Sequence, residues 1–156
     1  MKTTKVVIFD WLRTLYNPER QKLMPGALRL CRKLATRGVT LGIVSRGEPR
    51  PTGVPERKRQ IRESAVAKYC STLSVEKQKS PRQFRRILKK FPAGTTTFVV
   101  GDRIKEEIKM GNLLGLTTIW LKKGKFRKEV PTSACERPDF VIKNLAEAWP
   151  IIVPPR

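Results

Sequence analysis

The segment Lys5–Asp10, KVVIFD, is an unbroken run of mostly apolar, β-branched residues that ends on an aspartate. A run without polar alternation is typical of a strand buried on both faces of a parallel sheet. Three more segments have this character: 39–45 (VTLGIVS), Thr96–Gly101 (TTFVVG) and Thr117–Leu121 (TTIWL). We therefore expect a parallel sheet whose strands come from the whole length of the chain.

Helical patterns separate these strands. Helices are predicted over 25–37, 56–69, 105–114 and 145–152, and from Ser80 as N-cap with Pro81 as first residue to near Pro92. Short strands are predicted over 71–75 and Phe140–Ile142, and loops over 46–55 and 122–138. Parallel neighbours need crossover connections, so this alternation predicts a three-layer, Rossmann-like α/β fold with helices on both faces of the sheet.

The length of 156 residues indicates one domain, spanning 1–156. The connection between the first two strands has room for one helix and one loop, so no inserted cap domain is expected. No apolar run reaches the length of a membrane span, and the N-terminus lacks the pattern of a signal peptide. These features predict a cytoplasmic protein that does not enter a membrane.

The chain contains no histidine, which excludes His-based triads, His-ligated metals and a His general base. Its three cysteines, Cys31, Cys70 and Cys135, are widely spaced, odd in number and without a C-x-x-C pair. That pattern fits reduced thiols better than a disulfide framework or a zinc site. Carboxylates, lysine, the hydroxyl groups of serine and threonine, and cysteine remain as the candidates for chemistry.

Two of the three aspartates, Asp10 and Asp102, terminate predicted parallel strands, and Ser45 terminates a third. Ligands of open α/β sheets bind at this edge. One such aspartate alone is better explained as a salt-bridged loop residue. Two aspartates and a serine beside a Lys-Ser-Pro helix start favour a shared site. Converging carboxylates repel each other unless a cation lies between them, and Mg²⁺ suits such oxygen ligands.

These motifs resemble those of the haloacid dehalogenase-like (HAD) hydrolases, most of which are Mg²⁺-dependent phosphatases. The first family motif, Asp-x-Asp-x-Thr after an apolar strand, is similar to VVIFD-WLRTL, with Asp10 and Thr14 in place. The second, a strand that ends in Ser or Thr, matches Ser45. The third, a lysine just before a helix, matches Lys79 in KSPRQF, with Lys77 as a competing register.

The fourth motif, Gly-Asp with a second acid five residues later, matches Gly101, Asp102 and Glu107. Glu106 beside it offers the same charge, so Glu107 remains open as either a ligand or a solvated acid. The resemblance covers nearly the whole chain, with four motifs in order on the expected elements. It therefore implies a HAD-like fold.

The resemblance also implies a division of roles. Asp10 would attack a phosphoryl group to form an aspartyl-phosphate, and Lys79 would neutralise the phosphoryl oxygens. Thr14, Ser45 and Arg46 would bind the substrate. Mg²⁺ would be held by Asp10, Asp102, Glu107 and the backbone carbonyl of Leu12.

One departure from the family pattern concerns the second aspartate of the first motif, which is Leu12 here, followed by Arg13 where glycine is usual. In the phosphatases this aspartate is the general acid, a group typically worth about 10² to 10⁴ in rate. Family members with other chemistry also lack it. We therefore expect slow or atypical hydrolysis of a phosphomonoester, with a catalytically silent member of the fold as the alternative.

The net charge of +21, from 34 basic and 13 acidic residues, calls for anionic partners. Bases cluster over 46–62, 77–90 and 122–128, with few acids to form neutralising helical pairs. We expect a phosphorylated substrate, which can be as large as a macromolecule. The silent alternative would bind RNA or a ribonucleoprotein through these basic faces. The sequence does not indicate an oligomeric state.

Overall fold

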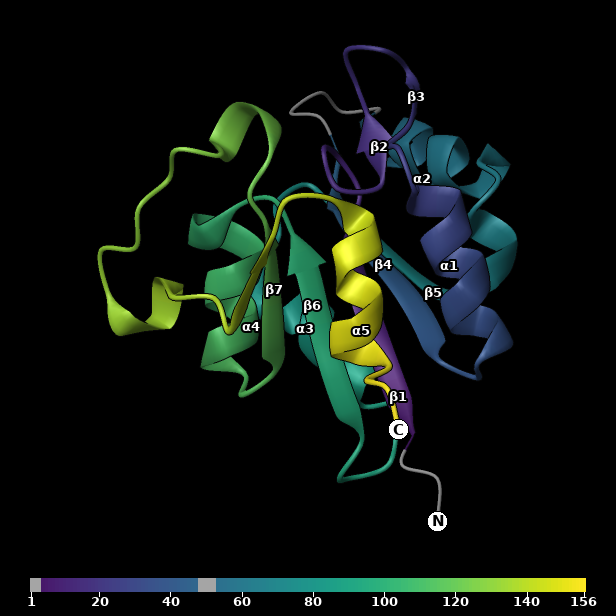
Figure 1. The fold of residues 1–156 in the computed structure, drawn as a ribbon. Helices are drawn as coiled ribbons and strands as arrows, with labels where there is room; N and C mark the ends of the chain where they lie inside the picture. The colour runs from purple at the N-terminus through teal and green to yellow at the C-terminus, as the bar shows by residue number, and fades with distance from the viewer. Residues whose placement is uncertain (1–3, 48–52) are drawn as a thin grey trace.

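The computed structural model describes residues 4–47 and 53–156 (Figure 1). Within this part of the chain, six parallel strands form the main sheet, in the order β5-β4-β1-β6-β7-β8. Their bounds are β1 Lys5–Asp10, β4 Thr40–Arg46, β5 Cys70–Glu76, β6 Thr96–Gly101, β7 Thr117–Leu121 and β8 Phe140–Ile142. The predicted parallel sheet is confirmed.

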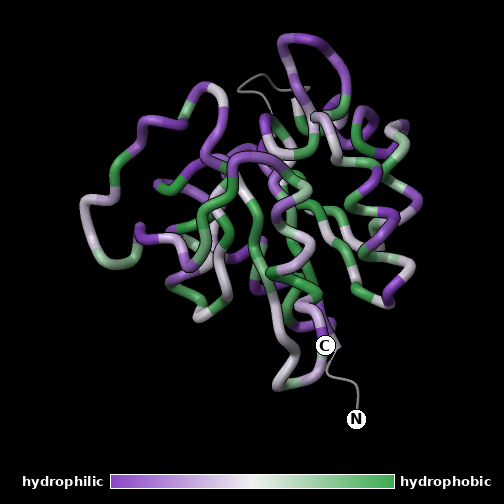
Figure 2. Tube along the Cα trace, in the orientation of Figure 1, coloured by the Kyte–Doolittle hydropathy of each residue, from purple (hydrophilic) through white to green (hydrophobic). Residues whose placement is uncertain are grey.

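Helices cover both faces of the sheet, as expected for three layers. One face packs against α1 (Ala27–Thr36), α2 (Gly53–Glu63) and α5 (Ala148–Ile152), and the other against α3 (Pro81–Leu88) and α4 (Lys109–Leu113). Side chains of β1 alternate between the two: Val7 and Phe9 join the first core, whereas Val6 and Ile8 join the second. Figure 2 shows the hydrophobic residues concentrated along the central strands.

The order of the strands determines where a site can form. From β1 the chain proceeds to β4 and β5 on one side, then crosses to β6, β7 and β8 on the other. Asp10 pairs in register with Val44, and Phe9 pairs with Val100, so β4, β1 and β6 end at the same level. This reversal of direction beside β1 is the kind of place where α/β sheets bind ligands.

The boundaries of α2 correct the predicted helix over 56–69. The helix begins at Gly53 and ends at Glu63, and Ala67–Tyr69 forms a separate 3₁₀ turn. Its start tolerates Pro55, because a proline in the first turn removes no intrahelical hydrogen bond. It stops where the Ser64 hydroxyl donates to the carbonyl of Ile61, at 2.6 Å, in place of a continuing backbone bond. Residues 48–52 of the predicted loop lie outside the described residues.

Several short elements were not predicted. A hairpin of β2 (Tyr16–Asn17) and β3 (Lys22–Leu23) occupies the connection between β1 and α1. The predicted loop over 122–138 contains the 3₁₀ turns Gly124–Phe126 and Ala134–Glu136.

Two predicted helices begin irregularly. The helix expected over 105–114 starts with a π-helical turn, Ile104–Ile108, before α4, and the one over 145–152 starts with a 3₁₀ turn, Leu145–Glu147, before α5. Among the described residues, none of the helices has the length and apolar character needed to cross a bilayer.

Candidate active site

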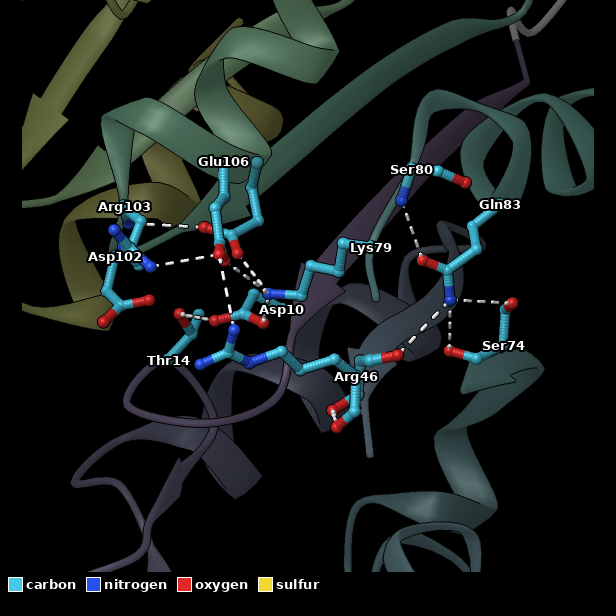
Figure 3. Close-up of polar contacts among 12 residues, drawn as sticks. Asp10, Thr14, Arg46, Ser74, Lys79, Ser80, Gln83, Asp102, Arg103 and Glu106 are labelled. Atoms are coloured by element: carbon cyan, nitrogen blue, oxygen red, sulfur yellow. Dashed lines mark hydrogen bonds and ion pairs between the residues drawn. The ribbon is translucent and has the colours of Figure 1, made fainter. Parts of the chain in front are cut away.

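The carboxylate of Asp10 lies at the centre of a buried polar cluster at the carboxyl ends of the strands (Figure 3). Its Oδ1 pairs with the Lys79 ammonium group, and its Oδ2 accepts a hydrogen bond from the Thr14 hydroxyl at 3.2 Å. Thr14 is reached by the turn that follows β1, and Lys79 comes from the segment before α3. The structure thus brings together three residues that were predicted as catalytic or substrate-binding, and it places Lys79 against Asp10, whereas Lys77 is exposed.

Two further buried acids lie beside Asp10. Asp102 directly follows β6, and Glu107 lies in the π-helical turn and pairs with Lys79. Carboxylate oxygens of Asp10, Asp102 and Glu107 lie within 4.8 Å of one another. Glu107 is only 1% exposed and belongs to this group of acids, whereas the side chain of Glu106 is 22% exposed.

The position of Glu107 depends on the absence of a side chain at Gly101. A Cβ atom there would lie 2.7 Å from Glu107 Oε2 and 2.8 Å from its Cβ, closer than atoms can pack. The backbone amide of Arg103 also donates to Glu107 Oε2, at 3.3 Å. The Gly-Asp pair therefore supplies one acid and makes room for the second.

Burial and charge act together on the ionisation of this cluster. Desolvation, followed by the negative charges of Asp10 and Glu107, raises the pKa of Asp102 to about 10. Burial and the charge of Asp10 likewise raise the pKa of Glu107 to about 8, against the opposing effect of Lys79. Burial alone would lower the pKa of Lys79, but the charges of Asp10 and Glu107 prevail and raise it above its ordinary value. One lysine does not offset the negative charge of three ionised acids, so Asp102 and Glu107 resist ionisation in the metal-free protein while Lys79 keeps its proton.

The start of α3 holds Lys79 in place. Ser80 is the N-cap residue, and its backbone amide donates to Gln83 Oε1 at 3.3 Å. The amide nitrogen of buried Gln83 donates to the backbone carbonyl of Ser45 and to Ser74 Oγ, at 3.3 and 3.2 Å. One side chain thus ties α3 to the ends of β4 and β5. Ser45 itself is buried, lines the pocket, and donates from Oγ to the carbonyl of Arg46 at 3.1 Å.

Leu12 and Arg13 both line the pocket. The side chain of Leu12 is half-buried and packs partly against the hydrophobic core. Because it is aliphatic, it has no proton to donate to a leaving group. Arg13 adopts a left-handed backbone conformation with φ of 61°, which is costly for a residue with a Cβ. Glycine, which adopts this conformation without strain, is the usual residue at this position in the HAD-like hydrolases that the sequence resembles.

The rim of the pocket contains residues that the sequence did not single out as site residues. Arg103 and Phe126 line the opening, together with the predicted substrate-binding residue Arg46. The guanidinium of Arg103 lies 4.1 Å from the centre of the Phe126 ring, and that of Arg13 lies 5.9 Å from it. The only signals in the sequence were that Arg103 follows Asp102 and that Phe126 lies in a basic segment.

The donor set fits a hard divalent cation. Its ligands are carboxylate oxygens, and Asp102 Oδ2 is buried without a hydrogen-bond partner among the described residues. A polar atom left in this state costs stability unless an ion or another donor satisfies it. Oxygen ligands of this kind suit Mg²⁺ rather than a thiolate- or imidazole-seeking metal.

Comparison with known proteins agrees with this geometry. Residues 78–148 match the HAD-hydrolase-like family model. Glyceraldehyde 3-phosphate phosphatase of Pyrococcus furiosus is 25% identical over 130 residues, which cover 83% of this chain and 54% of that protein. The chain therefore spans about half the length of this curated relative.

Solved structures share the fold. The magnesium-bound putative HAD-hydrolase YfnB of Bacillus subtilis has a TM-score of 0.66 at 23% identity, covering 83% of this chain and 56% of that one. D,D-heptose 1,7-bisphosphate phosphatase of B. bronchiseptica, complexed with magnesium and phosphate, has a TM-score of 0.75 at 14% identity, covering 96% and 98%. By the family match over residues 78–148 and by the shared fold, this chain is similar to the HAD-like hydrolases.

Proposed function

We propose that this chain is a phosphohydrolase that cleaves phosphomonoesters through an aspartyl-phosphate on Asp10. The observation that carries this proposal is the setting of the Asp10 carboxylate, which is buried, held by Lys79 and Thr14, and adjacent to two further acids. A carboxylate oxygen held in one orientation is suited to in-line attack on phosphorus. Lys79, at the base of the same pocket, is suited to neutralise the phosphoryl oxygens.

We propose that the metal in this site is Mg²⁺, with Asp10, Asp102, Glu107 and the backbone carbonyl of Leu12 as the groups that hold it. When bound, the ion supplies charge neutralisation at the phosphoryl oxygens. Asp102 Oδ2, which has no partner among the described residues, would gain one. The two positive charges of Mg²⁺ and the one of Lys79 would then balance the three negative charges of Asp10, Asp102 and Glu107.

In the first step, an Asp10 oxygen forms a bond to phosphorus while the ester P–O bond breaks. The departing alkoxide takes its proton from water, because Leu12 offers none. In the second step, water attacks the phosphorus of the aspartyl-phosphate, releasing inorganic phosphate and regenerating the Asp10 carboxylate. Missing general acid catalysis costs about 10² to 10⁴ in rate, so substrates with good leaving groups should react fastest.

Ser45 and Arg46 are proposed as substrate contacts on the opposite wall of the pocket from Asp102. We also propose that residues 1–156 act as one domain without an inserted cap. In support, the connection between β1 and α1 consists of the turn after Asp10 and the β2–β3 hairpin. The match to the heptose bisphosphate phosphatase, which covers nearly all of both chains, supports the same arrangement.

Hydrolysis of an aryl phosphate such as p-nitrophenyl phosphate tests the proposal, because its leaving group needs no proton. We expect turnover that requires Mg²⁺ and is lost in Asp10→Asn. Asp139→Asn is the matched control, since Asp139 accepts a hydrogen bond from the Thr118 amide at 2.8 Å, outside the pocket. Absence of turnover, together with steeply salt-dependent RNA binding, would instead support the silent module.

A further inference from the structure

The carboxylate of Glu106 is contacted by three cationic side chains at the mouth of the pocket (Figure 3). Arg103 Nη1 lies 3.0 Å from Oε1, Arg46 Nη1 lies 3.8 Å from Oε1, and Lys79 Nζ lies 3.7 Å from Oε2. The three cations come from separate elements: the end of β4, the segment before α3 and the residue after Asp102. A position surrounded by three cationic side chains favours the binding of an anion.

The cations differ in how firmly they are held. The Arg103 guanidinium rests over the Phe126 ring and pairs with Glu129 at 3.7 Å, so its direction is defined without Glu106. Arg46 extends from the opposite wall, with its side chain 53% exposed. Glu106, in contrast with Glu107, is partly exposed and has a route to solvent. Glu106 and Arg46 are therefore the members of the group whose side chains have room to move.

The charges of the side chains that line the pocket indicate how much anionic charge it can bind once a divalent cation is present. Four acidic and four basic side chains line it: Asp10, Asp102, Glu106 and Glu107 against Arg13, Arg46, Lys79 and Arg103. A divalent cation would leave a surplus of two positive charges, which one dianionic phosphoryl group neutralises. Outward rotation of Glu106 removes one more negative charge and frees Arg46 and Arg103 for another anion.

We propose that Arg46 and Arg103 form a second anion subsite, covered by Glu106 in the free protein, and that the preferred substrate is a small phosphomonoester carrying a second phosphate group. This inference rests on the proposed function. A phosphate displaces Glu106 because it carries more charge and more acceptor atoms than a carboxylate, in a geometry that guanidinium groups match. The two anion positions are adjacent because Lys79 contacts both Asp10 and Glu106. Both phosphates should therefore belong to one small molecule.

A matched pair of substrates, fructose 6-phosphate and fructose 1,6-bisphosphate, tests this subsite. We expect kcat/KM to be at least about tenfold higher for the bisphosphate, mainly through KM, and this ratio to approach one in Arg46→Gln and Arg103→Gln. Glu106→Gln should lower KM for the bisphosphate, because it removes the competing carboxylate charge. Arg86→Gln is the control: Arg86 is 54% exposed, pairs with Glu76 at 2.8 Å, and lies outside the pocket.

Equilibrium binding to the chain of residues 1–156 separates this inference from the proposed function. Calorimetry with both sugars in the presence of Mg²⁺ should give tighter binding of the bisphosphate, and Arg103→Gln should abolish the difference. A binding preference without turnover would refute the hydrolase but support the subsite. Turnover with equal affinity for both sugars would refute the subsite alone. Stronger competition by a 5′-phosphorylated oligonucleotide than by the bisphosphate would overturn the assignment to a small substrate.

Discussion

We infer that Leu12 separates this pocket from that of an efficient phosphatase. It lines the cavity two residues beyond Asp10, where a carboxylic acid would face the leaving group. We predict that Leu12→Asp raises kcat for an alkyl phosphate by about 10²-fold, because it restores a proton donor. The measurement is steady-state turnover with Leu12→Asn as the matched control, which has similar shape but no acidic proton. Equal rates in all three proteins would show that proton transfer does not limit the reaction.

Asp102 should destabilise the metal-free protein. In the unfolded chain, Asp102 ionises near the ordinary pKa of an aspartate, whereas in the folded protein it resists ionisation until about pH 10. Its unfavourable contribution to the free energy of unfolding therefore grows as the pH rises between these two values. We predict that Asp102→Asn raises the free energy of unfolding without metal at pH 8, by on the order of 1 kcal/mol. The gain over the unmodified protein should shrink towards pH 4.

Urea unfolding in a chelating buffer measures this difference. Added Mg²⁺ should stabilise the unmodified protein more than the variant, because the variant lacks one of the proposed ligands. Asp139→Asn, which removes a carboxylate charge outside the pocket, should show no gain at pH 8. A loss of stability in Asp102→Asn at every pH would mean that its carboxylate is satisfied within the fold.

At the level of single residues, the sequence located the buried polar residues of the pocket better than those of its rim. Asp10, Ser45 and Asp102 could be located because each lies at the carboxyl end of an apolar strand, and such strands end at one edge of a parallel sheet. Glu106 and Glu107 are adjacent acids, so only the π-helical turn and the space above Gly101 distinguish them. Phe126 could not be placed, since it comes from a loop with no periodic pattern.

Among the elements, α3 depends on Gln83 for its position. This fully buried amide joins the helix start to the carbonyl of Ser45 and to Ser74. We predict that Gln83→Met, which keeps the volume but removes the amide, lowers the free energy of unfolding by about 1 to 3 kcal/mol. It should also lower kcat, because Lys79 directly precedes the N-cap.

Chemical unfolding and steady-state kinetics test both effects, with Gln21→Met on the exposed surface as the control. Full activity in Gln83→Met would show that Lys79 is positioned by its ion pairs alone.

The segment after β7 is held by Glu136. Its Oε2 accepts from the amide and hydroxyl of Thr132, at 2.7 and 2.6 Å, and its Oε1 accepts from Lys105 at 3.3 Å. The bonds from Thr132, and then Lys105, lower the pKa of Glu136 to about 2. The resulting stability is present above the ordinary pKa of a glutamate and is lost as the pH falls through about 2.

We therefore predict that Glu136→Gln unfolds at lower urea concentration at pH 7, and that the gap from the unmodified protein narrows between pH 5 and pH 2. Parallel urea titrations at these pH values measure the gap, and the comparison cancels the titration of other acids. Glu147→Gln, an exposed acid on another turn, serves as a reference. A gap that does not change with pH would mean that charge is not the source of the stability.

Elements with strong patterns were predicted well, and short or irregular ones were not. The strands β1, β6, β7 and β8 follow the predicted bounds because each is a dense apolar run. The β2–β3 hairpin was missed because two-residue strands are too short for any alternation. Its geometry depends on the backbone turn at Arg13 and on stacking of Trp11 against Tyr16, with ring centres 5.1 Å apart.

Over the whole molecule, topology determines where the chemistry lies. Successive strands are added first on one side of β1 and then on the other, so segments separated by most of the chain meet at one edge of the sheet. Asp10, Lys79 and Asp102 reach this edge from three different connections. The chain carries a net charge of +21, and Arg46 and Arg103 bring part of its positive charge to the opening. An anionic ligand is therefore favoured both by the field of the molecule and by contacts within the pocket.

A crystal structure of the protein grown with Mg²⁺ and beryllium fluoride, which mimics a phosphoryl group, tests the central claim most directly. We predict a beryllium fluoride group joined to an Asp10 oxygen and in contact with Lys79, with the ion between Asp10 and Asp102. A bare Asp10 carboxylate, with the ion bound elsewhere on the surface, would contradict it.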